Sequence, residues 1–403
     1  MKGTSMRLTE EQIKQIKQKF GVNELWSFSK FDLYRSSHYE WMLKYLKHAK
    51  EDNEKVSAYA PIGGIVHDIT EKLYEGNIKY EDMYDEFDDL WITNIDVVGL
   101  VFDRNDSDKN NNIKNKYYND ITHFFTHYQM LPYKMHNEEF VAIKITDDIV
   151  MQGYIDAWYV DDEGYYNIVD YKTSTKYSGK AIRDHAAQLV LYSEGLRQSG
   201  IPKDKIRCCW NFLKYVNVDC EQVNGKIKTR TIERFEIGNK LKAPVKVWLK
   251  KLGYENDMDD YLEQLVLTND IGCLPEDVQK KFVIHDCYTY VDDIWDFYEE
   301  LKEEIVKTIT EIREKVREYK ALKAEKNDEA AEQLFWDDEE TIKAQSYYFN
   351  NLSGYSIKTI RPYKSYLDNL QKQKEGNIFT GLSNQNNNKD EIDEDDLSWL
   401  DSI

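Results

Sequence analysis

Three charged residues on two neighbouring segments have the types and spacing of a metal-dependent hydrolytic site. Asp156 lies in the first segment, and Asp170 and Lys172 lie in the second. Strand side chains alternate between faces, so Asp170 and Lys172 share one face. An acidic turn at residues 161–164 separates the segments and predicts a β-hairpin, in which Asp156 can lie beside Asp170. Two carboxylates can bind a divalent cation, and a lysine beside them can position water or stabilise negative charge.

The alternative is a solvated hairpin whose charges face water. The neighbours of the charged residues argue against it, because Ile155, Ile168 and Val169 indicate that both strands are partly buried. Charged groups among buried neighbours require a partner or a function. We therefore interpret the hairpin as a candidate site.

Two predicted helices carry further candidates. His67 lies in a predicted helix over residues 60–77, where Gly63 and Gly64 permit a close approach to the backbone. Gln188 and Tyr192 are spaced i, i+4 on a second predicted helix. For His67 the alternative is a core histidine, and for Tyr192 it is ordinary helix packing.

The four groups together resemble the RecB-like branch of the PD-(D/E)XK nuclease superfamily, which includes CRISPR-associated and phage exonucleases. The motifs of that branch are G-x-x-H, G-x-x-D, D/E-x-K and Q-x-x-x-Y. In this chain they correspond, in the same order, to Gly64–His67, Gly153–Asp156, Asp170–Lys172 and Gln188–Tyr192. The resemblance covers roughly residues 26–240. It implies an α/β (α+β) fold with a mixed central β-sheet flanked by helices and a restriction-endonuclease-like core.

The resemblance also implies roles for individual residues. His67, Asp156 and Asp170 would bind Mg²⁺ or Mn²⁺, with the main-chain carbonyl of Tyr171 as a further ligand. Lys172 would orient the attacking water and stabilise the pentavalent phosphate, leaving a 5′-phosphate and a 3′-hydroxyl. The remaining motif residues, which would face the active site and the DNA backbone, are Gln188 and Tyr192.

Two differences between relatives bear on the cofactor. Some relatives place an additional acidic residue where Glu138 and Glu139 stand. Several relatives have a cysteine near the position of Ser37 as a ligand of an iron–sulfur cluster. This chain has no cysteine before Cys208, so we expect no iron–sulfur cluster.

The expected activity is that of an exonuclease on single-stranded or duplex DNA ends, in recombination, repair or phage DNA metabolism. One alternative is an endonuclease of defence or counter-defence. Another is a non-catalytic DNA-binding or scaffold subunit, although the intact Asp-Asp-Lys set argues against it.

Composition sets the outer limits of the interpretation. The chain has 403 residues, a net charge of −20 and five cysteines. It contains no apolar run long enough for a membrane span and no signal peptide, so we expect reduced cysteines in a cytoplasm. Residues 170–251 carry 18 Lys and Arg against 8 Asp and Glu, a local charge of +10 that could attract a polyanion.

We expect a nuclease domain over residues 1–240 and a helical region over 241–370. Within the first, residues 78–135 form a helical insertion with a loop at 106–115, and the sheet has three or four strands. Four aromatic residues of the insertion either fill a core or stack on unpaired bases; they are Trp91, Phe124, Phe125 and Tyr128. Residues 371–403 predict a disordered acidic tail, which either binds a protein partner or only adds solubility.

Overall fold

The protein is described from a computed structural model, which covers residues 8–51 and 57–355 and four isolated positions between 362 and 372. The chain forms two compact units. The first contains residues 1–28 and 57–307, and the second contains residues 29–56 and 308–403. The predicted acidic tail over residues 371–403, with its predicted partner binding, lies outside the described residues except for position 372.

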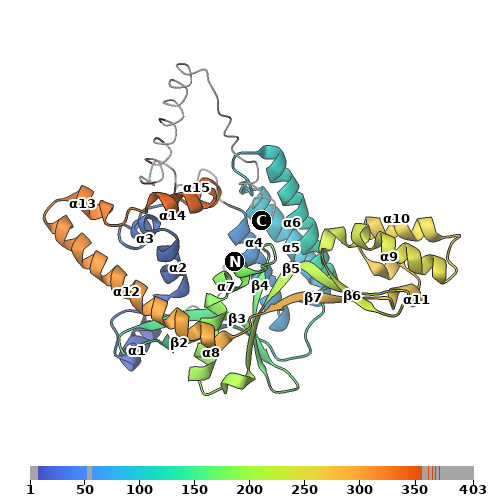
Figure 1. The fold of residues 1–403 in the computed structure, drawn as a ribbon, viewed down its shortest axis with the longest axis horizontal. Helices are drawn as coiled ribbons and strands as arrows, with labels where there is room; N and C mark the ends of the chain where they lie inside the picture. The colour runs from blue at the N-terminus through green and yellow to red at the C-terminus, as the bar shows by residue number, and fades with distance from the viewer. Residues whose placement is uncertain are drawn as a thin grey trace, which may run out of the picture. The chain divides into compact units, whose positions relative to one another are not determined.

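A mixed β-sheet is the centre of the first unit (Figure 1). Its order is β1-β3-β4-β5-β6, with β2 also paired to β3 and β7 also paired to β5. Pairs β1/β3 and β4/β5 are parallel, and the others are antiparallel. The strands are β1 (Trp26–Ser27), β2 (His136–Lys144), β3 (Val150–Val160), β4 (Tyr166–Lys172), β5 (Ile206–Glu221), β6 (Ile227–Glu233) and β7 (Phe282–Tyr290). The prediction of three or four strands was therefore too low, because β1 is only two residues long and β7 lies among helices.

The predicted hairpin is confirmed, and the sheet contains a second one. β3 and β4 pair with Ala157 opposite Val169, and Gly164 supplies the positive φ of +78° in their turn. β5 and β6 are joined by a turn in which Gly225 also has a φ of +78°. The first hairpin fixes the register of the acidic residues.

Helices cover the sheet. The predicted helix of His67 is confirmed as α4 (Tyr59–Tyr74), and that of Gln188 as α8 (Ala187–Gln198). The other helices of this unit are α1 (Glu10–Phe20), α5 (Met83–Trp91), a π-helical turn (Ile92–Asp96), α6 (Ser107–His127), α7 (Lys180–His185), α9 (Ile237–Lys251), α10 (Met258–Thr268), α11 (Glu276–Gln279) and the first part of α12 (Ile294–Ala324). Short 3-10 turns occur at Tyr80–Asp82, Lys203–Lys205, Arg234–Glu236 and Ile271–Cys273.

The predicted loop at 106–115 is wrong, since almost all of it belongs to α6. The side chain of Asp106 accepts hydrogen bonds from the backbone amides of Asp108 and Lys109 and so caps this helix. The polar run suggested a loop, but it is the solvated first half of a helix whose second half is buried.

The four aromatic residues of the insertion lie in a core with α4, α5 and α6. Trp91, Phe124, Phe125 and Tyr128 are each at most 5% exposed. The core interpretation is therefore confirmed and base stacking by these residues is wrong. Val169 of β4 contacts the same core, so the neighbouring residue Asp170 points to the other face of the sheet.

A separate core stabilises an extension of the sheet that we call the arm. The arm consists of residues 216–282, which include β6, α9, α10 and α11 and the adjoining parts of β5 and β7 (Figure 1). Its core contains Val218, Leu241, Trp248 and Leu265. One face of the arm's sheet is therefore packed against helices.

The second unit is helical. It contains α2 (Phe28–Ser36) from Ser29 onward, α3 (His38–Tyr45), the second part of α12, α13 (Asp328–Gln333), α14 (Glu339–Ala344) and α15 (Ser346–Asn351). Asp337 fixes the start of α3, because its carboxylate accepts hydrogen bonds from the Ser37 hydroxyl and the His38 amide, both at 2.7 Å. In the described part of the chain no helix is long and apolar enough to cross a membrane.

Candidate metal centre

An opening in the sheet positions the candidate site. β1 pairs with β3 at Met151 and Gln152, and β4 pairs with the same side of β3 from Ala157 onward. β1 and β4 therefore share one edge of β3, while β2 pairs along most of its other edge. Residues 153–156 of β3 therefore have no partner on this side among the described strands, and Asp156 stands at the edge of the opening.

Asp156 and Asp170 come together as the sequence predicts. The register that pairs Ala157 with Val169 places Asp156 opposite Asp170 one step further along. Burial raises the pKa of Asp156 well above its ordinary value, and the negative charge of Asp170 raises it further. Two neighbouring carboxylates repel one another unless a cation or a proton lies between them.

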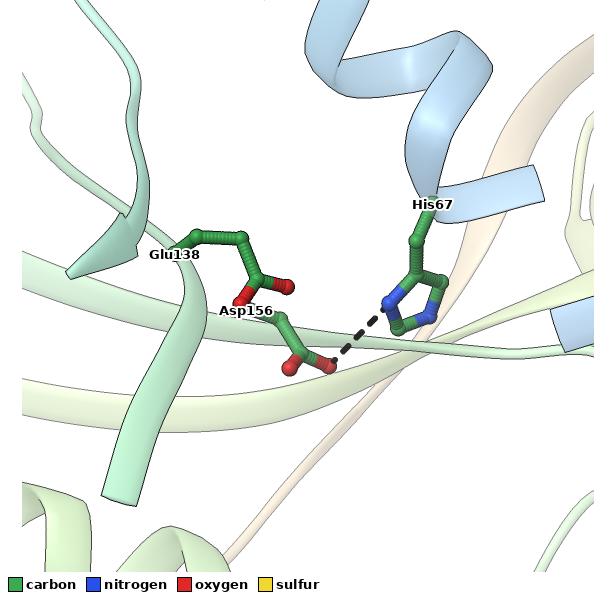
Figure 2. Close-up of side chains that lie close together, drawn as sticks. All are labelled: His67, Glu138 and Asp156. Atoms are coloured by element: carbon green, nitrogen blue, oxygen red, sulfur yellow. Dashed lines mark ion pairs between the residues drawn. The ribbon is translucent and has the colours of Figure 1, made fainter. Parts of the chain in front are cut away.

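His67 reaches the opening from α4. Its Nε2 lies 2.9 Å from the carbonyl oxygen of Tyr171. A carbonyl only accepts hydrogen bonds, so Nε2 is the donor in this contact, and Nδ1 is the ring nitrogen left for another partner. Nδ1 faces Asp156, with 3.8 Å between Nδ1 and Oδ2 (Figure 2). Histidines that bind metals commonly donate their other N–H to a carbonyl in this way.

Glu138 of β2 completes this group. Asn137 pairs with Ala157 and Glu139 pairs with Ile155, so Glu138 stands opposite Asp156. Its backbone has a φ of +48°, an uncommon conformation for a residue other than glycine. One ligand atom from each of His67, Glu138 and Asp156 lies within 4.8 Å of the others (Figure 2).

Lys172 is held by Asp170. Its Nζ lies 2.8 Å from Asp170 Oδ2. Burial opposes the charge of the ammonium, but Asp170 and Asp156 outweigh it and raise the pKa of Lys172. Lys172 is therefore a cation at neutral pH and cannot act as a general base. Asp170 is 5% exposed, and its other oxygen, Oδ1, is buried without a hydrogen-bond partner in the described structure.

These residues fit a divalent cation. The site offers an imidazole nitrogen and three carboxylates, and hard oxygen ligands suit Mg²⁺ and Mn²⁺. A cation here would also compensate the buried oxygen of Asp170 and the repulsion between Asp156 and Asp170.

The comparisons with known proteins agree with this geometry. The family description of the PD-(D/E)XK nuclease superfamily matches residues 25–325, about three quarters of the chain. The chain belongs to the PD-(D/E)XK nuclease superfamily. Among individual curated proteins, none matches it. Membership supports a metal-dependent nuclease in general, and it confirms the superfamily inferred from the four motifs.

Gln188 and Tyr192 lie at the other end of the opening. Gln188 Nε2 donates a hydrogen bond of 2.8 Å to the Tyr192 hydroxyl. The Tyr192 ring lies directly over Gly153, where an added Cβ would be 2.7 Å from Cε1. The glycine of the G-x-x-D motif therefore leaves room for the tyrosine of the Q-x-x-x-Y motif.

An open groove of about 420 Å³ adjoins the candidate metal centre. α4 contributes Gly64 and His67 to its wall, and α6 contributes Tyr117. Lys172 and the hydroxyl-bearing residue Thr173 line the other side. A phosphate entering this groove meets the cationic Lys172.

The sequence placed Glu138 less well than the other residues. Only the additional acidic residue that some relatives have at this place pointed to it, and Glu139 was an equal candidate. In the structure Glu139 Oε2 accepts a hydrogen bond from Trp158 Nε1 at 2.7 Å, whereas Glu138 joins His67 and Asp156.

Proposed function

We propose that the protein is a Mg²⁺- or Mn²⁺-dependent deoxyribonuclease of the RecB-like branch, acting as an exonuclease on DNA ends. The observation that carries the proposal is the convergence of His67, Glu138 and Asp156 beside the Asp170–Lys172 pair. A structural ion pair alone would not require a histidine and a further glutamate at the same place.

The metal ligands of the proposal are the side chains around the opening. His67 supplies Nδ1, and Asp156, Asp170 and Glu138 supply carboxylate oxygens. The Tyr171 carbonyl, in this arrangement, orients His67 through the hydrogen bond to Nε2. A bound divalent cation would polarise the scissile phosphate and lower the pKa of an attacking water.

Lys172 then works as a fixed positive charge. Its ammonium, held by Asp170, orients the attacking water and stabilises the negative charge that develops on the pentavalent phosphate. Gln188 and Tyr192 border the site, and we assign them contact with the DNA backbone. An in-line displacement of this kind leaves a 5′-phosphate and a 3′-hydroxyl.

The proposed setting is recombination, repair or phage DNA metabolism in a cytoplasm. All five cysteines are free, and four of them are buried. Free thiols of this kind are usual in a reducing compartment.

Cleavage of end-labelled DNA tests the proposal. Linear duplex, single-stranded and covalently closed circular DNA are incubated with Mg²⁺, with Mn²⁺ or with EDTA. Lys172→Ala is compared with Lys320→Ala, which removes an exposed lysine of α12 in the second unit. We expect metal-dependent cleavage of linear DNA that falls about 10²- to 10³-fold in Lys172→Ala and is unchanged in Lys320→Ala.

The products decide the finer points. Release of mononucleotides or short oligonucleotides from ends, with closed circles intact, supports the exonuclease. Cutting of closed circles shows an endonuclease instead. A folded wild-type protein that binds DNA but cleaves none of these substrates would refute the catalytic proposal.

A further inference from the structure

The outer face of α9 carries a row of lysines. Lys242, Lys246 and Lys250 are spaced i, i+4 and i+8, so they lie along one side of the helix over about 12 Å. The opposite side, which includes Leu241 and Trp248, is buried in the core of the arm. All three lysines are exposed, and within the described residues none has an ion pair.

This arrangement is unfavourable for the helix by itself. Like charges at i, i+4 destabilise a helix, and here two such pairs follow one another. Residues 226–251 contain nine Lys and Arg but only two Glu, in a chain with a net charge of −20. A polyanion on this face would compensate the repulsion.

The lysine row is connected to the groove of the nuclease site. Tyr117 of α6 lines the groove, and the adjacent residue Lys116 lies over the ring of Phe235 at 5.5 Å. Asp120 of α6 accepts a hydrogen bond of 3.0 Å from the Phe235 amide. α9 begins at Ile237, so α6 fixes the start of α9 beside the wall of the groove.

The other helix of the arm has the opposite character. α10 exposes Asp259, Asp260 and Glu263, which repel a polyanion. The charge on the arm is therefore divided between two helices, and only α9 suits an anionic partner.

We propose that the lysine row of α9, Lys242, Lys246 and Lys250, is a second nucleic-acid-binding site that holds the DNA backbone outside the catalytic groove. The choice of DNA as the polyanion rests on the proposed nuclease function. Over about 12 Å one strand of B-form DNA presents three to four phosphates, since they follow at about 3.4 Å along the axis. Phosphate contacts of this kind position a nucleic acid without selecting its sequence.

The test is a binding titration without cleavage. A labelled 30-nucleotide single strand and the corresponding duplex are titrated with protein in EDTA over a series of salt concentrations. A variant with Lys242→Gln, Lys246→Gln and Lys250→Gln is compared with the wild type. The matched control makes the same three changes on α1, at Lys14, Lys17 and Lys19, and so alters the net charge equally.

At moderate salt we expect the α9 variant to bind DNA at least about tenfold more weakly than the wild type. The slope of log K against log salt should fall by about 2.7 for duplex and about 2.1 for single strand. The α1 control should keep the wild-type slope. The melting temperature of the α9 variant should be unchanged or higher, because the substitutions remove repulsion and leave the buried side of the helix intact.

Three results would overturn the inference: an equal loss in both triple variants, no loss in either, or a wild type that binds no DNA in EDTA. Hydrolysis of bis(4-nitrophenyl) phosphate, which is too small to reach α9, measures the nuclease site alone. It therefore distinguishes failure of the second site from failure of the proposed nuclease function. If that hydrolysis depends on Lys172 while the α9 variant binds DNA normally, the nuclease stands and the second site is wrong.

Discussion

Gly153→Ala is the most direct test of how the motifs fit together. An added Cβ at this position would lie 2.7 Å from Cε1, 2.9 Å from Oη and 3.2 Å from Cζ of Tyr192. Ordinary contacts begin near 3.4 Å, so the ring must retreat by about 0.7 Å. Tyr192 is only 7% exposed and its hydroxyl is held by Gln188 at 2.8 Å, so little room exists for this movement.

The cost follows from these contacts. Overpacking a well-filled site costs about 1–3 kcal/mol, and stretching the hydrogen bond from Gln188 costs about 1 kcal/mol more. We expect Gly153→Ala to lower the free energy of unfolding by about 2–4 kcal/mol. Urea denaturation measures this change in the free energy of unfolding. Gly63→Ala is the matched control, because a Cβ there meets nothing within 4 Å and alanine favours the helix.

A double-mutant cycle with Tyr192→Leu identifies the cause. If the ring is the obstacle, Gly153→Ala should cost little in the Tyr192→Leu background, with a coupling energy of about 1–3 kcal/mol. Additive effects of the two substitutions would refute the reasoning, since the cost of Gly153→Ala would then arise elsewhere.

Three further predictions concern other parts of the first unit. Glu138→Gln should weaken Mn²⁺ binding about 10- to 100-fold in isothermal titration calorimetry, the range seen when a partner of a metal site is lost; unchanged affinity would exclude Glu138 as a ligand. Burial raises the pKa of Asp120 from 3.8 to about 7, so the folded state binds the carboxyl proton of Asp120 more tightly than the unfolded state does. The stability that this proton contributes is lost as pH rises from about 4 to about 7. The stability of the wild type relative to Asp120→Asn should therefore fall by up to about 4 kcal/mol over this range, and a pH-independent difference in chemical denaturation would contradict it. Gly238→Ala should destabilise the arm by more than about 3 kcal/mol, because the added Cβ would meet the Leu265 carbonyl and the Val266 Cα backbone of α10; protease resistance equal to that of the wild type would show that α10 can shift.

Local patterns in the sequence predicted the hairpin and the two helices of the site. The turn at residues 161–164 fixes the register of β3 and β4, and Asp156 and Asp170 meet because of that register. The spacing of apolar residues and the residue types of turns depend on positions close together in the chain, so a single sequence reveals them.

The less predictable features depend on contacts between distant segments. β1 is two residues long and pairs with a strand more than a hundred residues away, so no local pattern identifies it. Glu138 joins the site through the pairing of β2 with β3 and through its left-handed φ. Neither property follows from the residue types around it. The first half of α6 has the composition of a loop and is helical because its second half is buried in the core.

The candidate metal centre combines several features that oppose folding. Asp156 and Asp170 repel each other, Asp170 Oδ1 is buried without a partner, and Glu138 has a strained backbone. Each lowers the stability of the metal-free protein. A divalent cation would compensate the first two, since it neutralises the carboxylates and occupies the unpaired oxygen. Protein contacts alone orient two of the side chains: His67 hydrogen-bonds the Tyr171 carbonyl, and Lys172 pairs with Asp170. We therefore infer that binding a cation would recover part of the energy that this arrangement of acidic groups costs.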